Sequence, residues 1–200
     1  HAELVIKVKE PIESEYQYLR NDLTLFTYLH LAGDLVNAKK LIATGVRGIA
    51  YETVTSDDGS MPLLAPMSAI AGQISIVVGS YHLLKHNLGK GVLIGSFGDI
   101  SPRIVTVIGG GVAGTEAISK AVANDAFVKV IDLSKDKLVE LEARFGNQNI
   151  EYILSSPQNI QDAIAISDLV IGAVYVIGKE APKVITLDML KGMKPGTVMV

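Results

Sequence analysis

The sequence predicts an α/β fold built on a doubly wound parallel sheet, joined to part of a second α/β domain. Three observations lead to this prediction. Apolar runs of strand length alternate with helical patterns from residue 104 onward, a glycine pattern GxGxxG at 109–114 follows the first of those runs, and a shorter alternation of strands and helices precedes residue 62. Strands that alternate with helices are typical of parallel sheets that the helices cover.

In the C-terminal part, the predicted strands are nearly continuous apolar runs. They cover 104–108, 127–132, 150–154 and 169–174, and the predicted helices between them cover 112–124, 135–145 and 160–167. Strands buried on both faces lose the alternation of apolar and polar residues, so these runs indicate a parallel sheet covered on both sides. Residues 197–200 begin a further strand.

The N-terminal part has shorter elements. Residues 4–8 alternate with a period of two, which is typical of a strand. We expect strands at 4–8, 23–29 and 48–54, helices at 13–20 and 34–44, and a turn at Asp57-Asp58-Gly59. Gly45 is placed to close the second helix. These elements predict a separate α/β unit over residues 1–62.

A long apolar helix is expected to link the two parts, running from Pro66 to about His86. Gly72 and Gly79 lie inside it, and glycine at such positions favours close packing against another helix. The glycine-rich segment 89–102 is interpreted as connecting turns with a short strand at 91–94.

Composition and charge argue against several classes of protein. Hydrophobic residues make up 48% of the chain and charged residues 20%, which is enough for a sizeable core. The net charge is −3 and there is no basic block, so we expect neither nucleic acid nor an anionic membrane surface as a partner. No apolar run reaches the roughly 18 to 20 residues that span a bilayer. The absence of cysteine excludes disulfides and thiolate catalysis and fits a cytoplasmic location.

The histidines do not follow a metal-ligand spacing such as HExxH. His82 and His86 are four residues apart on the predicted helix, so they are either a metal pair or two partly exposed helix histidines. We favour the second interpretation and expect no metal site.

The glycine pattern is the strongest single motif. Gly109, Gly111 and Gly114 follow a predicted strand and open a helix, which is the context of a Rossmann-type dinucleotide site. The next strand ends in Asp132, 18 residues after Gly114, where a carboxylate can bind a ribose 2′-hydroxyl. Asp132 therefore favours NAD over NADP. The alternative is an ordinary glycine turn, with Asp132 capping the helix that follows Ser134.

Lys9 and His30 are the candidate catalytic residues. Each lies at the end of a predicted strand, and ligands of open α/β sheets gather at the carboxyl ends of strands. A lysine that binds a substrate oxygen and a histidine that exchanges a proton would suit a keto acid. The alternatives are a structural histidine and a simple ion pair between Lys9 and Glu10.

Several longer segments resemble the alanine dehydrogenase family, in that family's order and over nearly the whole chain. They are KVKEP at 7–11, LFTYLHLA at 25–32, IAYETV at 49–54, PLLAPMSAIAG at 62–72, the glycine loop, and IGAVYVIGKEAPK at 171–183. The resemblance implies reversible conversion of L-alanine, water and NAD to pyruvate, ammonium and NADH. It assigns Lys9 to substrate binding and His30 to acid–base catalysis. It places Ser68, the glycine loop, Asp132, Ala173 and Val174 against NAD.

The resemblance also implies a domain organisation. Residues 1–62 would form part of the substrate domain, and residues 63–200 the linking helix and an NAD-binding domain that lacks its C-terminal part. The family pattern includes a substrate-binding arginine before residue 1 and a catalytic aspartate after Val200, so we expect an incomplete chain that lacks both ends and keeps a cofactor fold without turnover. The resemblance further implies a homo-oligomer, a hexamer as is common in that family, and a cytoplasmic location.

Three rival functions stay open. The NAD-binding subunit of a nicotinamide nucleotide transhydrogenase resembles the same family but lacks the histidine that stands here as His30. A non-catalytic NAD-binding module is the second rival, against which Lys9 and His30 weigh. The third is a saccharopine or lysine-ketoglutarate reductase, against which the segments YLHLA and APMSAIAG weigh.

Overall fold

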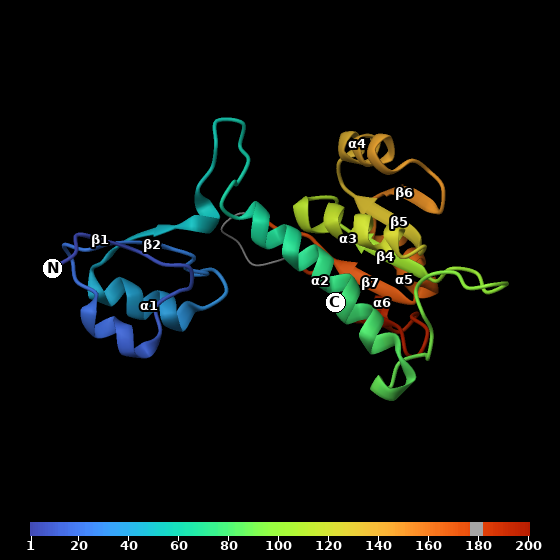
Figure 1. The fold of residues 1–200 in the computed structure, drawn as a ribbon, viewed down its shortest axis with the longest axis horizontal. Helices are drawn as coiled ribbons and strands as arrows, with labels where there is room; N and C mark the ends of the chain where they lie inside the picture. Colours follow the sequence, from blue (N-terminus) through green and yellow to red (C-terminus); the bar gives the residue numbers. More distant parts are fainter. Residues whose placement is uncertain (177–181) are drawn as a thin grey trace. The chain divides into compact units, whose positions relative to one another are not determined.

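The computed structural model describes residues 1–176 and 182–200, which divide into two compact units (Figure 1). The first unit contains residues 1–67 and Val176, and the second contains residues 68–175 and 182–200. All of the predicted substrate-domain part, residues 1–62, lies in the first unit. The assignment of substrate and cofactor to the two units stays a prediction.

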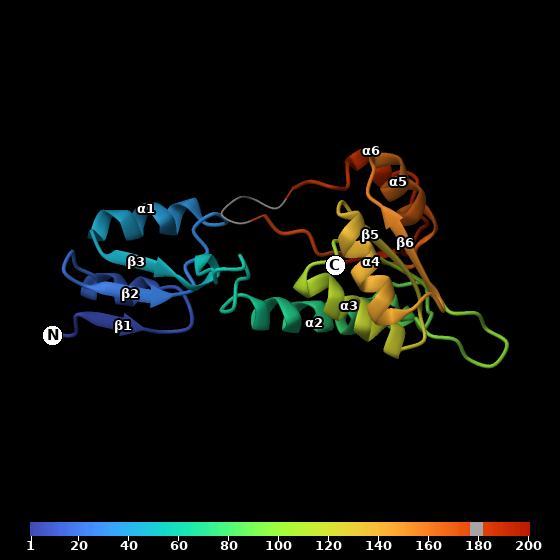
Figure 2. The ribbon, with the colours of Figure 1, turned by 90° about the horizontal axis from the view of Figure 1, so that it is seen from above.

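The first unit is built on three parallel strands in the order β1 (Leu4–Ile6), β2 (Thr24–Thr27) and β3 (Arg47–Ala50). The 3-10 helix η1 (Glu13–Tyr18) joins β1 to β2, and helix α1 (Leu35–Thr44) joins β2 to β3. Both cover the same face of the sheet (Figures 1 and 2). A small core lies beneath them, made of Leu25, Leu29 and Leu41 with partly buried neighbours such as Tyr16 and Leu19.

All five predicted elements of this unit are present, but most are shorter than expected. The predicted helix at 13–20 is a 3-10 helix that ends at Tyr18, and the predicted strand at 48–54 gives way at Tyr51 to the 3-10 helix η2 (Tyr51–Thr53). Gly45 ends α1 with a φ of 70°, a left-handed conformation that glycine adopts easily, as predicted.

The second unit is a five-stranded parallel sheet in the order β6-β5-β4-β7-β8. Its strands are β4 (Ile104–Ile108), β5 (Phe127–Asp132), β6 (Ile150–Leu154), β7 (Leu169–Gly172) and β8 (Val198–Met199). From β4 the chain adds β5 and β6 on one side and then β7 and β8 on the other. This reversal next to β4 is the switch point of a doubly wound sheet, where ligands bind. The predicted fold class is confirmed.

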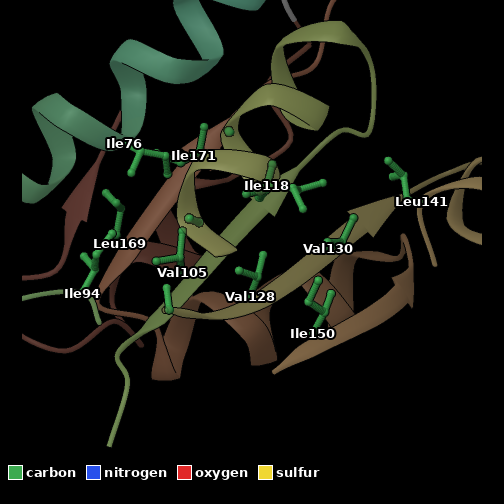
Figure 3. Close-up of a cluster of buried hydrophobic side chains, with 14 of the residues drawn as sticks. Ile76, Ile94, Val105, Ile118, Val128, Val130, Leu141, Ile150, Leu169 and Ile171 are labelled. Atoms are coloured by element: carbon green, nitrogen blue, oxygen red, sulfur yellow. The ribbon is translucent and has the colours of Figure 1, made fainter. Parts of the chain in front are cut away.

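Helices cover both faces of this sheet. Helices α2 (Ala65–Leu83), α3 (Val112–Ala123) and α4 (Lys135–Phe145) share one core cluster with the strands, and α5 (Pro157–Ile166) and α6 (Leu187–Leu190) share another. Figure 3 shows Ile118 of α3 above Val105 and Val128, which are fully buried. Each such side chain contributes about 1.5–3 kcal/mol to stability. No helix among the described residues has the length and apolar character needed to cross a membrane.

Helix α2 lies very close to its neighbours, as its glycines predicted. A Cβ on Gly72 would lie 2.0 Å from the carbonyl oxygen of Ala113 in α3, and one on Gly79 would lie 2.4 Å from a methyl of Leu169. The first contact is the predicted helix–helix packing, while the second is with a strand. A side chain at Gly72 would push α2 away from α3, and one at Gly79 would push it away from the sheet.

Two expectations for the segment after α2 are wrong. The helix ends at Leu83 instead of His86, which lies in a separate 3-10 helix, η3 (Lys85–Asn87). Residues 91–94 do not form a strand, because the backbone N–H groups of Gly91 and Val92 bond to the Leu83 carbonyl at 2.8 and 3.4 Å. The segment closes the end of α2 and so does not pair with the sheet.

Candidate functional site

The candidate catalytic residues lie at one edge of the first unit's sheet. Lys9, His30 and Glu52 come two or three residues after β1, β2 and β3, respectively. Because the three strands are parallel, their carboxyl ends lie at the same edge. The segments after β1 and β2 are hydrogen-bonded to each other: the Tyr28 N–H bonds to the Val8 carbonyl at 3.3 Å, which extends the pairing of the two strands.

Lys9 and His30 meet at the carboxylate of Glu10. The Lys9 Nζ lies 3.2 Å from Glu10 Oε2, and the His30 Nε2 lies 3.9 Å from the same oxygen. Both basic side chains are more than half exposed, at 66% and 54%, while Glu10 is only 33% exposed. Its own backbone N–H, followed by the Lys9 ammonium, holds the pKa of Glu10 below its usual value. The pairing of Lys9 with Glu10 is present, and it does not separate Lys9 from His30.

The backbone of His30 has an unusual conformation. Its φ is 50°, in the left-handed region that costs a side-chain-bearing residue about 1–2 kcal/mol. Glu52 stabilises this conformation, because its carboxylate accepts the N–H of His30 at 2.6 Å and the N–H of Leu29 at 3.2 Å. The sequence analysis gave Glu52 no role. Glu52 lies inside the strand predicted at 48–54, so its place beyond the end of β3 became visible only in the structure.

An aromatic group supports the same edge. The ring of Tyr28 stacks on the His30 imidazole with centroids 5.9 Å apart, and Tyr51 meets Tyr28 edge-on at 5.0 Å. Phe26 in turn contacts Tyr51 at 4.4 Å. The Tyr28 hydroxyl donates a hydrogen bond to the Leu63 carbonyl. One face of the His30 imidazole is therefore packed against Tyr28, while the side chain as a whole is 54% exposed.

In the second unit, the glycine loop lies at the carboxyl end of β4, at the switch point. Gly109 has a φ of 101°, and a Cβ there would lie 2.6 Å from the Ala173 carbonyl oxygen. A Cβ on Gly114 would lie 1.8 Å from the Gly109 carbonyl oxygen, so the start of α3 must pass directly over the loop. Gly111 differs, because a Cβ there would meet nothing within 4 Å. Of the three glycines of the GxGxxG pattern, Gly109 and Gly114 are therefore sterically required, whereas Gly111 faces open space.

Asp132 is bonded to this loop. Its Oδ2 accepts the N–H of Gly110 at 2.6 Å, and its Oδ1 accepts the N–H of Ser134 at 2.7 Å. The cap of α4 is Ser134, whose hydroxyl accepts the Lys137 N–H at 3.2 Å. The alternative in which Asp132 caps that helix is therefore wrong. Gly110, which the motif treats as a free position, is a partner that the sequence analysis missed.

The remaining cofactor candidates lie in the same unit. The Ala173 N–H bonds to the Ile108 carbonyl at 2.8 Å, so the chain after β7 runs beside the glycine loop. A Val174 methyl lies 3.2 Å from a Cβ built on Gly109. Ser68 is on α2, one helical turn before Gly72, which touches the first turn of α3. The structure therefore gathers Ala173 and Val174 at the loop and places Ser68 on the helix beside it.

Part of one quoted segment, residues 177–181, lies outside the described residues. Within residues 1–176 and 182–200, no three histidine, aspartate or glutamate side chains gather as metal ligands. His82 and His86 both contact the Tyr81 ring edge-on, at 5.3 and 5.8 Å.

Comparison with known families decides the affiliation of this chain. The family model described as the N-terminal domain of alanine dehydrogenase/PNT matches residues 1–71, and that of the C-terminal domain matches residues 75–200. The chain belongs to the alanine dehydrogenase/PNT family. The two matched regions correspond closely to the two compact units.

Individual relatives agree with this membership of the alanine dehydrogenase/PNT family. The chain is 48% identical to the alanine dehydrogenases of Staphylococcus haemolyticus and Bacillus subtilis over 199 residues, which is 100% of the chain and 53% and 52% of those proteins. A solved L-alanine dehydrogenase matches 99% of the chain and 55% of its own length, with a TM-score of 0.87 and 41% identity. A transhydrogenase from Sinorhizobium meliloti shares the fold, with a TM-score of 0.76 and 24% identity over 99% of this chain and 57% of its own. The chain spans about half the length of the curated relatives it matches.

Proposed function

We propose that the intact protein is an NAD-dependent L-alanine dehydrogenase, which converts L-alanine, water and NAD reversibly to pyruvate, ammonium and NADH. One observation carries the proposal. Lys9 and His30 lie beyond adjacent strands at one sheet edge, and both contact the carboxylate of Glu10. The names of the 48% identical relatives support the choice of substrate.

Lys9 and His30 supply complementary chemistry for a keto acid. The Lys9 ammonium donates a hydrogen bond to an oxygen of pyruvate, which makes the carbonyl carbon more electrophilic where ammonia adds. When ammonia has added to the carbonyl carbon, the proton that its nitrogen loses converts the carbonyl oxygen to a hydroxyl. The His30 imidazolium gives a second proton to this hydroxyl, which leaves as water, so that an iminium and a neutral imidazole remain. In the other direction, the neutral imidazole takes a proton from the attacking water.

The residues of the second unit fit NAD as the cofactor. The open space at Gly111 lets a pyrophosphate approach the first N–H groups of α3, which carry no side-chain cap. Each oxygen of Asp132 accepts one backbone N–H and keeps a lone pair for a ribose hydroxyl. Bound NAD supplies the hydride chemistry. We assign it the residues Ser68, Gly109, Gly111, Gly114, Asp132, Ala173 and Val174.

We further propose that the protein acts as a homo-oligomer, with a hexamer as the expected state. An apolar stripe on α2 supports association: Ile70, Ile74, Val77 and Tyr81 are each about half exposed on one side of the helix. Stripes of this kind are typical of helices that pack against a partner. Sedimentation of the intact protein measures the subunit number directly.

The decisive experiment is NADH oxidation by the intact protein with ammonium and one of three keto acids: pyruvate, glyoxylate or 2-oxoglutarate. We expect pyruvate to give the highest kcat/KM. Faster turnover with 2-oxoglutarate would contradict the proposal in favour of a larger amino acid. Hydride transfer from NADH to an NADP analogue, without any keto-acid reduction, would instead identify a transhydrogenase.

A further inference from the structure

We infer that Glu52 is a positioning residue for His30: it acts through the backbone, and it fixes the direction in which the imidazole leaves the sheet edge. This inference rests on the proposed acid–base role of His30. The observation behind it is that one carboxylate accepts both consecutive N–H groups of the loop after β2, those of Leu29 and His30.

The three contacts act on a conformation that needs support. His30 is a non-glycine residue with a φ of 50°, and its side chain is 54% exposed, so side-chain burial does little to hold it. The shortest contact, 2.6 Å, is to the His30 N–H itself. A charged acceptor forms a stronger bond than a neutral one, so the carboxylate opposes relaxation of φ toward the usual negative values.

The hydrogen bond from His30 to Glu52 also connects the ends of two strands. Glu52 lies in η2, directly after β3, whereas His30 follows β2. Tyr51, its neighbour in the same 3-10 helix, packs edge-on against Tyr28, whose ring stacks on His30. The η2 segment therefore supports His30 twice, through the backbone by Glu52 and through the ring stack by Tyr51.

Lys9 is held by groups other than Glu52: its ammonium pairs with Glu10, and its carbonyl accepts the Thr27 hydroxyl at 2.9 Å. Loss of Glu52 should thus disturb proton transfer and leave the binding of pyruvate and NADH largely intact. In steady-state kinetics this appears as a lower kcat with little change in KM.

The test compares Glu52→Ala and Glu52→Gln in the intact protein. We expect Glu52→Ala to lower kcat about 100-fold, the cost of a displacement of about 1 Å at a reacting group. Glu52→Gln should lose less, because its amide oxygen can still accept the His30 N–H. Asp58→Ala is the matched control: that carboxylate also accepts a backbone N–H, from Ser60 at 2.9 Å, but in a remote turn, and kcat should not change.

A double variant separates positioning from general stability. If Glu52 acts through His30, Glu52→Ala should cause no further loss of kcat in a His30→Ala background. A full additional 100-fold loss, or an unchanged kcat in the single Glu52→Ala variant, would overturn the inference.

A crystal structure of the intact Glu52→Ala variant gives a readout that is independent of activity. We expect the φ of His30 to leave the left-handed region and the imidazole to move from Tyr28. An unmoved His30 would overturn the inference even if kcat fell. If the wild-type protein shows no turnover with pyruvate and ammonium, the proposed function fails, while this structural comparison still decides whether Glu52 sets the His30 backbone.

Discussion

The carboxylate of Asp132, at the tip of β5, is bonded to the backbone N–H of Gly110 in the loop after β4, at 2.6 Å. The second oxygen is held by the Ser134 N–H at 2.7 Å. Two backbone N–H donors fix the orientation of the Asp132 carboxylate, so its negative charge is held beside the glycine loop. A ribose 2′-hydroxyl can donate to it, whereas a 2′-phosphate meets a like charge.

We therefore predict that the intact protein binds NADH more tightly than NADPH. Two unit charges about 4 Å apart repel by roughly 1–4 kcal/mol at the effective dielectric of a surface cleft. Asp132→Asn removes the charge and keeps one oxygen acceptor, so it should narrow the preference mainly by improving NADPH binding. Dissociation constants from fluorescence titration measure both effects. Equal affinities of the wild-type protein for the two nucleotides would contradict this prediction.

The second prediction concerns His30. In the intact protein, His30→Ala should lower kcat for pyruvate reduction by about 10²- to 10⁴-fold, the range expected when a general acid–base is lost. The NADH dissociation constant should stay the same, because the glycine loop belongs to the other compact unit. His82→Ala serves as a control, since that histidine lies near the end of α2. A kcat that stays within threefold of wild type would rule out the proposed proton transfer.

The third prediction compares two glycines of the loop, Gly114, which is crowded by backbone atoms, and Gly111, which faces open space. Gly114→Ala forces a methyl to within 1.8 Å of the Gly109 carbonyl oxygen, so the variant should unfold at lower temperature and lose NADH binding. Gly111→Ala meets nothing within 4 Å at a φ of −66°, so it should keep its stability. It should still bind NADH more weakly, because the added methyl occupies the space proposed for the pyrophosphate.

Thermal unfolding and NADH titration of both variants distinguish the two effects. Gly192→Ala is the control, because its nearest atom would be 3.6 Å away and it lies outside the loop. If Gly111→Ala binds NADH as the wild type does, the pyrophosphate does not approach this loop.

The sequence predicted the second unit better than the first for a physical reason. Strands at 104–108 and 127–132 have the predicted bounds because most of their residues are buried, and burial in a covered parallel sheet is a strong local signal. The edge strand at 150–154 also has the predicted bounds, although only Ile150 is buried in it. In the first unit, only one face of the sheet is covered, so Leu4 and Ile6 remain more than half exposed and apolar character alone does not mark where a strand ends.

Contacts between distant residues were beyond sequence reasoning. Residues 91–94 have the composition of a strand, but the Leu83 carbonyl accepts the N–H groups of Gly91 and Val92. Lys90, just before them, is bound to Asp168 at 2.8 Å. Likewise, the bond from His30 to Glu52 joins residues 22 positions apart. Lys9 and His30 were found because each follows a segment of strand character, and the pairing of Lys9 with its neighbour Glu10 was considered from the sequence. The contact of His30 with Glu10 and its bond to Glu52 depend on the tertiary structure.

The last prediction concerns acid stability. The Lys7 ammonium, followed by the Ile12 N–H, holds the pKa of Glu15 below its ordinary value of 4.5. The Glu15 side chain is 40% exposed and the Lys7 side chain 25%, so the ion pair is worth about 0.2–1 kcal/mol. Because the folded pKa is lowered, this contribution is present above pH 4.5 and disappears as the pH falls through the folded value.

Glu15→Gln should therefore destabilise the intact protein at pH 7 and have progressively less effect below pH 4.5. Urea unfolding midpoints of the wild type and the variant at pH 7, 5 and 3.5 measure the difference. Glu13→Gln is the matched control: its carboxylate belongs to the same 3-10 helix and pairs with Lys40, but it is 78% exposed, so its loss should change the midpoint less. A difference between wild type and Glu15→Gln that is as large at pH 3.5 as at pH 7 would show that the substitution acts through packing, because the contribution of a lowered pKa already declines below pH 4.5, where Glu15 of the unfolded chain takes up a proton.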